Sequence, residues 1–217
     1  MGGMHVYYDR RAPEFDDWWF GTGLFAERPR SGWNEEVEAL LACVAGLPPA
    51  PTLDLGCGTG FLTRHLRAPV LVGFDWSLAM LRRARTRLPR AALVRGDALA
   101  LPFKSGALAR VFTSHLYGHL LERERQTFLS EARAVGHELV VVDAGTRGGD
   151  PRGEWQERSL GDGSRHRVYK RFFTAEGLAA ELGGGRVLHE GHWFVVVATL
   201  GPGPDPRIRP HQDGAGD

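Results

Sequence analysis

Residues 53–60 read Leu-Asp-Leu-Gly-Cys-Gly-Thr-Gly, so an apolar segment runs directly into three alternating glycines. We expect a strand before this loop and a helix, Phe61–Leu66, after it. Glycine permits tight turns and lets the backbone approach a ligand closely. At the carboxyl end of the first strand of an open α/β sheet, such a loop predicts a binding site for a nucleotide-like ligand.

The spacing of the glycines narrows the kind of nucleotide. Gly56, Gly58 and Gly60 form a GxGxG pattern, whereas the dinucleotide fingerprint requires glycine at its sixth position, where this chain has Phe61. No Lys-Ser or Lys-Thr pair follows the loop, which excludes a P-loop. An NAD-dependent oxidoreductase is therefore disfavoured, and it stays an alternative that binding of a nicotinamide cofactor would revive.

Short apolar runs alternate with helical patterns on the carboxyl side of this loop. Such runs suit strands buried on both faces, and their alternation with helices predicts a doubly wound α/β sheet. The predicted strands are Thr52–Leu55, Val70–Phe74, Ala92–Val94, Leu108–Thr113 and Glu138–Asp143, with Arg186–Glu190 and Phe194–Leu200 as an antiparallel hairpin at one edge. The predicted helices are 77–88, 121–134 and 174–182, the last with Thr174 as its N-cap.

The chain divides into three unequal segments. Residues 1–50 form an aromatic and charged cap segment, residues 51–200 form the ligand-binding domain, and residues 201–217, rich in Gly and Pro, are expected to be disordered. Eight aromatic side chains fall within the first 33 positions: Tyr7, Tyr8, Phe15, Trp18, Trp19, Phe20, Phe25 and Trp33.

Composition excludes several classes of protein. The chain has 217 residues, 42% hydrophobic and 24% charged, which is typical of one globular domain rather than a disordered chain. The net charge of +1 gives no strong field, so neither nucleic acid nor a membrane is expected as a partner. No apolar run reaches the roughly 18 residues of a membrane helix, and no signal peptide is expected. The two cysteines, Cys43 and Cys57, suit a reducing compartment, and we expect a cytoplasmic protein.

The glycine loop and three downstream segments resemble the class I S-adenosylmethionine (SAM) dependent methyltransferases, over roughly residues 5–200. The likeness is to the small-molecule branch of ubiquinone/menaquinone-type enzymes, with a methyltransferase-11-like domain. The downstream segments are Val72-Gly73-Phe74-Asp75, then Arg95-Gly96-Asp97-Ala98 with Leu101-Pro102-Phe103, and Val111-Phe112-Thr113-Ser114-His115 with Gly118-His119-Leu120. The resemblance implies a Rossmann-like seven-stranded sheet of order 3-2-1-4-5-7-6, with strand 7 antiparallel, helices on both faces and an N-terminal helical cap.

The resemblance also implies which residues hold SAM. Asp75, 19 residues after Gly56, would accept hydrogen bonds from the ribose hydroxyls, and Asp97 would accept one from the adenine amine. Asp54 would face the cationic amino group of the methionine portion. The full predicted cofactor set is Tyr8, Asp54, Gly56, Cys57, Gly58, Gly60, Asp75, Trp76, Met80, Asp97, Ala98 and Ser114. The alternative for Asp75 and Asp97 is that they are turn or cap residues.

The N-terminal segment carries part of the same resemblance. Tyr8-Asp9 and Phe15-Asp16-Asp17-Trp18 match a segment that covers the SAM site in relatives, although Phe15 replaces the usual Tyr. Aromatic faces attract a sulfonium cation by about 0.5–2 kcal/mol. The predicted acceptor-binding residues are Trp18, Trp19, Tyr117 and His119. The alternative is that these aromatics only fix a surface helix to the domain.

His115 directly follows the predicted fourth strand and is the candidate general base. Methyl transfer is an in-line displacement in which orientation supplies about 7–11 kcal/mol, and a base adds rate only when the acceptor needs to lose a proton. The alternative for His115 is packing in the loop. The basic segment Arg165 to Arg171 either binds an anionic substrate or is solvated. No metal site is expected, because His and Cys show no ligand spacing.

These patterns predict SAM-dependent methyl transfer to a small-molecule acceptor, giving S-adenosylhomocysteine. The cofactor is SAM, and the expected partner is the acceptor, whose reacting atom the sequence leaves open. Two other functions stay open: a SAM-binding regulatory or scaffold protein without catalysis, and an RNA or protein methyltransferase. The oligomeric state is not determined by the sequence.

Overall fold

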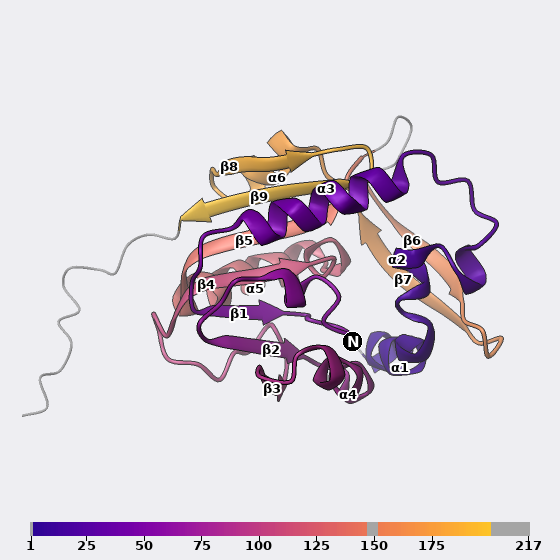
Figure 1. Ribbon diagram of the computed structural model, residues 1–217, viewed down its shortest axis with the longest axis horizontal. Helices are drawn as coiled ribbons and strands as arrows, with labels where there is room; N and C mark the ends of the chain where they lie inside the picture. Colours follow the sequence, from indigo (N-terminus) through magenta and orange to yellow (C-terminus); the bar gives the residue numbers. More distant parts are fainter. Residues whose placement is uncertain (1, 147–151, 201–217) are drawn as a thin grey trace, which may run out of the picture.

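The computed structural model describes residues 2–146 and 152–200, and a seven-stranded sheet forms its centre (Figure 1). The order of strands across this sheet is β3-β2-β1-β4-β5-β9-β8, and the pair β6-β7 forms a second sheet. The strands are β1 Thr52–Leu55, β2 Leu71–Asp75, β3 Ala92–Arg95, β4 Leu108–Ser114, β5 Gly136–Ala144, β6 Gly153–Ser159, β7 Arg165–Arg171, β8 Arg186–Glu190 and β9 Phe194–Leu200. The α-helices are α1 Gly2–Arg11, α2 Asp17–Phe20, α3 Trp33–Gly46, α4 Leu78–Arg87, α5 Glu122–Val135 and α6 Ala175–Glu181.

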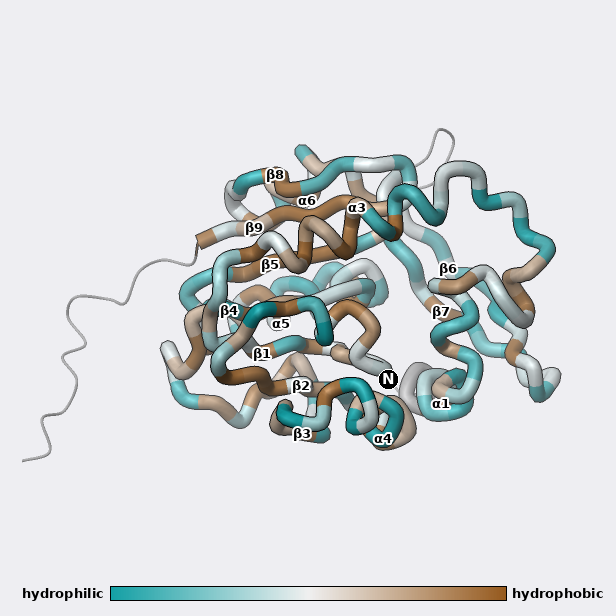
Figure 2. Tube along the Cα trace, in the orientation of Figure 1, coloured by the Kyte–Doolittle hydropathy of each residue, from teal (hydrophilic) through white to brown (hydrophobic). Residues whose placement is uncertain are grey.

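The side chains of the central strands point alternately to the two faces of the sheet, and both faces are buried. On β5, Val140 and Val142 pack in a cluster with Leu40 of α3, whereas Leu139 and Val141 pack in a cluster with residues of α5 and α6. Successive side chains of a strand point to opposite faces, so one apolar run supplies both cores. Figure 1 shows α3 in front of the sheet with α5 and α6 behind it, and Figure 2 shows the hydrophobic stretches of β5, β9 and α3 gathered there.

All seven predicted strands of the main sheet are confirmed within one or two residues, and β9 is antiparallel to both its neighbours. The predicted order, 3-2-1-4-5-7-6, differs from the observed one. Two strands, β6 and β7, form an antiparallel hairpin before the last pair, so β9 and β8 take the places predicted for strands 7 and 6. The sequence of β6, GEWQERS, is polar and gives no apolar run that would have predicted it.

Two predicted helix boundaries have different outcomes. Thr174 caps α6 as predicted, since its hydroxyl accepts a hydrogen bond from the Gly177 backbone N–H. The helix predicted over Phe61–Leu66 is wrong: only a 3₁₀ turn, Thr63–His65, is present. Leu66 is already extended at φ −70° and ψ 127°, because the chain must turn back to begin β2 at Leu71.

The N-terminal segment and the β6-β7 hairpin lie side by side at one end of the main sheet (Figure 1). Tyr7 of α1 is fully buried and clusters with Leu160 and Val168 of the hairpin. The N-terminal segment and the hairpin therefore lie at the carboxyl ends of β1, β2 and β4, where ligands bind in open α/β sheets. The predicted tail, residues 201–217, lies outside the described residues.

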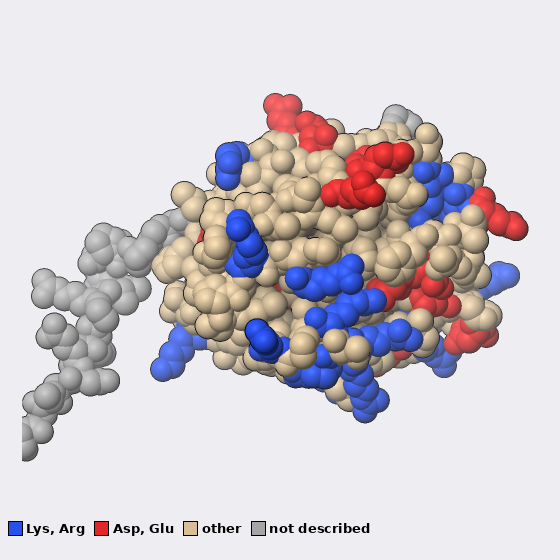
Figure 3. Space-filling view, in the orientation of Figure 1, with Lys and Arg blue, Asp and Glu red and all other residues tan. Residues whose placement is uncertain are grey.

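Charge on the surface is segregated by element. Figure 3 shows Lys and Arg gathered over α4, whose sequence LAMLRRARTR carries four arginines, and acidic side chains over α3. One of these arginines, Arg87, turns inward to pair with Asp16 of the N-terminal segment. Among the residues that the structure describes, no helix is long and apolar enough to cross a membrane.

Replacing Leu40 by Ala tests the packing of α3 on the sheet. Leu40 is fully buried, so Leu40→Ala is expected to lower the free energy of unfolding by about 2–5 kcal/mol. The exposed Glu38 on the same helix gives the control, and Glu38→Ala is expected to change it by less than about 0.5 kcal/mol. Urea denaturation measures both variants, and equal effects would contradict this packing.

Candidate functional site

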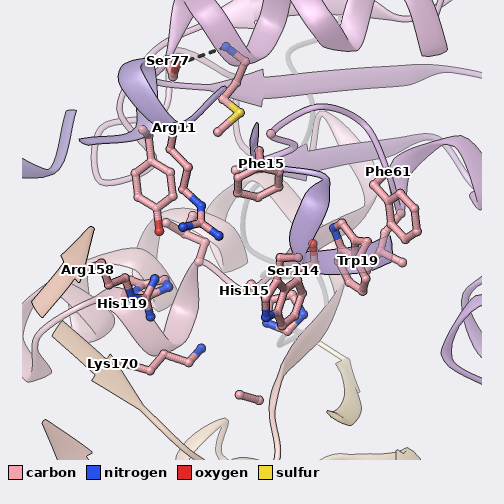
Figure 4. A pocket seen from close by; sticks show the side chains of 18 of the residues that line it. Arg11, Phe15, Trp19, Phe61, Ser77, Ser114, His115, His119, Arg158 and Lys170 are labelled. Atoms are coloured by element: carbon pink, nitrogen blue, oxygen red, sulfur yellow. Dashed lines mark hydrogen bonds between the residues drawn. The ribbon is translucent and has the colours of Figure 1, made fainter. Parts of the chain in front are cut away.

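A cavity of about 920 Å³ opens at the carboxyl ends of β1, β2 and β4. Small-molecule sites have volumes of about 300–1,000 Å³, so this cavity can take a cofactor with a second molecule beside it. We call the part around the glycine loop and Asp75 the cofactor half. The acceptor half is the part lined by Tyr8, Arg11, His115, His119, Arg158 and Lys170. Figure 4 shows most of these side chains.

The glycine loop has a backbone that only glycine adopts easily. Gly56, Gly58 and Gly60 have φ angles of +73°, +54° and +79°, in the left-handed region. A Cβ on Gly56 would lie 3.1 Å from Leu116, and a Cβ on Gly58 would lie 3.5 Å from the ring of Phe15. Side chains here would fill the space between the loop and its neighbours, Leu116 after β4 and Phe15 of the N-terminal segment, which fits a ligand held against bare backbone.

Asp75, the last residue of β2, ties the loop to the next helix. Its Oδ2 accepts the backbone N–H of Gly58 and its Oδ1 accepts that of Ser77, both at 2.8 Å. Burial raises the pKa of Asp75 to about 6, although these two hydrogen bonds oppose the rise. A carboxylate has about four lone-pair sites, so both oxygens can still accept hydroxyl groups of a ribose.

Asp97 and its neighbours line the same half of the cavity. Asp97 and Ala98 follow β3, and Trp76 and Met80 lie on the turn after β2 and the first turn of α4. The Oδ1 of Asp97 accepts the backbone N–H of Leu99 at 2.9 Å, so this carboxylate also serves as a turn residue. Ten predicted cofactor residues line the cavity: Tyr8, Gly56, Cys57, Gly58, Asp75, Trp76, Met80, Asp97, Ala98 and Ser114.

Asp54 and Gly60 lie outside the cavity lining, contrary to the predicted set. Gly60 faces α4, where a Cβ would lie 2.9 Å from Leu88, so packing explains this glycine. Asp54 is buried beneath the loop with Oδ2 bonded to the Thr63 hydroxyl, and its Oδ1 has no partner among the described residues. Burial raises its pKa to about 7. The predicted contact of Asp54 with the amino group of the cofactor therefore has no support from the cavity lining.

The N-terminal segment covers the cavity and is tied down on both sides. The hydroxyl of Thr59, in the glycine loop, donates to Asp16 at 2.6 Å, and Arg87 of α4 pairs with the same carboxylate. The hydroxyl of Ser77 donates to Asp9 of α1. These contacts place Phe15 and the two tryptophans that follow it over the ligand site.

His115 lies in an aromatic cluster at the end of β4. Its ring centroid is 4.9 Å from that of Trp18, 5.5 Å from that of Trp19 and 5.6 Å from that of Phe194. Its φ is +54°, and it is the one described residue other than glycine with a positive φ. Backbone strain of this kind is concentrated at functional sites.

The two ring nitrogens of His115 have different surroundings. Nδ1 lies 3.9 Å from Oδ1 of the buried Asp143, whereas Nε2 is buried with no partner among the described residues. Burial lowers the pKa of His115 to about 3, which the charge of Asp143 opposes, so the ring is neutral at pH 7. Asp143 favours the proton on Nδ1, which would leave a lone pair on Nε2.

The other predicted acceptor residues separate into two groups. Trp18, Trp19 and His119 line the cavity. Nδ1 of His119 donates a hydrogen bond to the carbonyl oxygen of Tyr169. Burial lowers the pKa of this histidine, so the ring is neutral and Nε2 carries no proton. Tyr117 does not line the cavity: its ring is fully buried against Phe128 and Phe173, and its hydroxyl donates to Glu181.

Three charged residues in or next to the acceptor half were not among the predicted site residues. Arg11 comes from α1, Arg158 from β6, and Asp143 from β5, where it pairs with Lys170 of β7. Lys170 belongs to the basic segment for which anion binding or solvation was open, and it is only 6% exposed. The strand pattern of 165–171 gave the one usable signal, because His166, Val168 and Lys170 share a face. Within residues 2–146 and 152–200, no group of three or more His, Cys, Asp or Glu side chains is arranged to hold a metal ion.

Residues 52–137 match the sequence profile of a family described as methyltransferase domain. An uncharacterized methyltransferase of Alkaliphilus oremlandii is 26% identical over 148 residues, which is 66% of this chain and 68% of that protein. The trans-aconitate 2-methyltransferase of Rhizobium meliloti is 47% identical over 66 residues, 28% of this chain but only 25% of that enzyme.

A solved structure described as a DhpI–S-adenosylhomocysteine complex has a TM-score of 0.72 and 25% identity to this chain, covering 93% of this chain and 97% of its own. The fold and these matches show that the chain has a SAM-dependent methyltransferase fold, and its cofactor is S-adenosylmethionine. The residues present fit that cofactor, with Asp75 for the ribose and bare glycine backbone for the amino-acid tail.

Removing the Asp75 carboxylate tests the cofactor half. Asp75→Ala deletes charge-assisted hydrogen bonds worth about 1.5–3 kcal/mol, so SAM and S-adenosylhomocysteine should bind roughly 10- to 100-fold more weakly. Isothermal titration calorimetry measures both affinities, with the exposed Glu122→Ala as control. An unchanged dissociation constant in Asp75→Ala would remove this carboxylate from the site.

The raised pKa of Asp75 also predicts a pH dependence. Below about pH 6 the carboxyl is protonated and accepts hydrogen bonds less well, so affinity for S-adenosylhomocysteine should rise between pH 5 and pH 7.5. The stability of the unliganded protein should change with pH in the opposite direction to this affinity. Because the pKa of Asp75 is raised on folding, its contribution to the free energy of unfolding is fully present below about pH 3.8 and is lost as pH rises through 6. Calorimetry and thermal melts across this range check both slopes. A pH-independent affinity in the wild type, or the same slope in Asp75→Asn, would contradict the assignment.

Proposed function

We propose that this chain transfers the methyl group of SAM to a small-molecule acceptor by in-line displacement, leaving S-adenosylhomocysteine. The observation that carries the proposal is that one cavity joins the cofactor half to a second half around His115. A protein that only bound SAM would not need this additional space. The reaction is of the EC 2.1.1 type, and we place it in the cytoplasm because both Cys43 and Cys57 are free thiols.

The roof over the cavity favours a small acceptor. Phe15, Trp18 and Trp19 line it from the N-terminal segment, and the ties of Asp16 to Thr59 and Arg87 hold this segment down. A polymer such as RNA would need an open groove with stacking surfaces and phosphate contacts. The N-terminal segment carries part of the resemblance to ubiquinone-type enzymes, and its aromatic faces would suit a flat apolar part of an acceptor.

SAM supplies an electrophilic methyl group on a sulfonium. The chain orients the two reactants, excludes water with its aromatic roof, and provides the neutral His115 as base. Asp75 and the glycine loop would hold SAM, which would supply its methyl group to the acceptor oxygen or nitrogen and leave as S-adenosylhomocysteine. The acceptor proton would pass to Nε2 of His115, and the charge of Asp143, 3.9 Å from Nδ1, would offset part of the burial that disfavours the imidazolium.

A direct test incubates the purified chain with SAM and a panel of small hydroxy and amino compounds, and follows S-adenosylhomocysteine by mass spectrometry. Methylated product from one class of acceptor supports the proposal. Firm SAM binding with no product from any acceptor in the panel would favour the regulatory alternative.

His115→Asn separates catalysis from cofactor binding. Asparagine tolerates the left-handed backbone at φ +54°, so the fold should be kept while the base is lost. We expect kcat to fall by about 10²–10⁴-fold with the dissociation constant for SAM nearly unchanged. Steady-state kinetics and calorimetry measure the two quantities. Wild-type turnover in His115→Asn would make this histidine structural.

A further inference from the structure

Two arginines in the acceptor half have only neutral hydrogen-bond partners among the described residues. Arg11, 8% exposed, donates from Nη1 to the hydroxyl of Tyr7 at 2.8 Å. Arg158 donates to Oε1 of Gln156 at 2.8 Å from Nη2, and its Nη1 lies 3.5 Å from the same Tyr7 hydroxyl. One phenol oxygen therefore holds two guanidinium groups next to each other.

Adjacent cations without an anion are unfavourable in a partly buried site. Buried charges are normally paired, because burial without a partner costs several kcal/mol. The carboxylates that line the same cavity are engaged or directed elsewhere. Asp75 and Asp97 belong to the cofactor half, and Glu124 accepts the backbone N–H of Leu121.

The remaining nearby carboxylates do not neutralise the pair either. Glu157 also lines the cavity, but it is an exposed residue next to Arg158 on β6, where successive side chains point to opposite faces of the strand. Asp143 is paired with Lys170, whose ammonium also lines the cavity. Figure 4 shows Arg11, Arg158 and Lys170 pointing toward one part of the cavity, beside His119.

We propose that Arg158 and Arg11 bind an oxyanionic group, a carboxylate or a phosphoryl-type group, of the methyl acceptor. The planar guanidinium fork matches both kinds of oxyanion through paired N–H···O bonds. This proposal rests on the proposed methyl transfer and names the class of acceptor: a small acid that also carries a nucleophilic hydroxyl or amine. A neutral or cationic acceptor would leave two charges uncompensated.

The oxyanion is an anchor and not the reacting atom. Oxygens that accept hydrogen bonds from two guanidinium groups have their lone pairs engaged and are poor nucleophiles. The lone pair expected on His115 Nε2 would instead accept a proton from a neutral O–H or N–H. The acceptor therefore spans the acceptor half, with its acid at the arginines and its nucleophile at His115.

Binding of simple oxyanions tests the site without knowledge of the acceptor. Phosphate and acetate are titrated, at constant ionic strength, into protein saturated with S-adenosylhomocysteine, and isothermal titration calorimetry reports binding. We expect saturable binding in the wild type and roughly 10- to 100-fold weaker binding in Arg158→Gln. Arg158→Lys keeps the charge without the fork and should lie between these two. Arg167→Gln, on the exposed face of β7 opposite Glu157, is the matched control and should bind as the wild type does.

Three results of this titration would overturn the proposal. The first is that neither anion binds the wild type. The second is that Arg158→Gln and Arg158→Lys both bind anions as the wild type does. The third is that Arg158→Gln weakens S-adenosylhomocysteine as much as it weakens the anions, since the arginines would then hold the cofactor's own carboxylate.

Turnover separates this proposal from methyl transfer itself. Hydroxy acids and amino acids are compared with their methyl esters, which lack the carboxylate charge, as acceptors, and S-adenosylhomocysteine is measured. We expect the acids to be preferred, and Arg158→Gln to raise KM for them roughly 10- to 100-fold with a smaller effect on kcat. Equal turnover of acids and esters would contradict the anion site but would still support methyl transfer. Anion binding that depends on Arg158, with no methylated product from any acceptor, would contradict methyl transfer but would still support the anion site.

Discussion

The carboxylate of Asp75 joins the glycine loop, the end of β2 and the start of α4, and the ligand site depends on this connection. One oxygen accepts the N–H of Gly58 and the other that of Ser77. Ser77 in turn caps α4 through Met80 and donates to Asp9 of α1. A single network therefore positions the loop, the helix and the N-terminal cover. Its carboxylate is also the group expected to accept the cofactor ribose.

The central strands were predictable because a strand that is buried on both faces of a sheet is a continuous apolar run in the sequence. The strands β1, β4 and β5 are apolar runs, and the loop after β1 needs its positive φ angles. The β6-β7 hairpin was not predictable, since it buries one face against Tyr7 and its alternation, in polar residues, is weak. The 3₁₀ turn Thr63–His65 replaced a helix because the return to β2 leaves few residues.

The two halves of the site also differed in how far the sequence could predict them. The cofactor half lies on short local motifs next to strand ends, so the motif resemblance could predict Asp75 and Asp97, and both residues line the cavity. The acceptor half gathers Arg11, Arg158 and Lys170 from three distant segments, with Asp143 buried behind Lys170, and only the fold brings them together. Tyr117 was misassigned because its neighbours His115 and His119 line the cavity, whereas its own ring turns into the core. Charge in this half is what gives the acceptor its chemical class.

A crystal structure of the chain with S-adenosylhomocysteine tests the central claim most directly, namely that one cavity holds cofactor and acceptor in line. We predict the ribose hydroxyls on Asp75, the amino-acid tail along Gly56 to Gly58, and the sulfur facing His115 across the acceptor half. A sulfur that points away from His115, or a ligand bound away from the glycine loop, would contradict it.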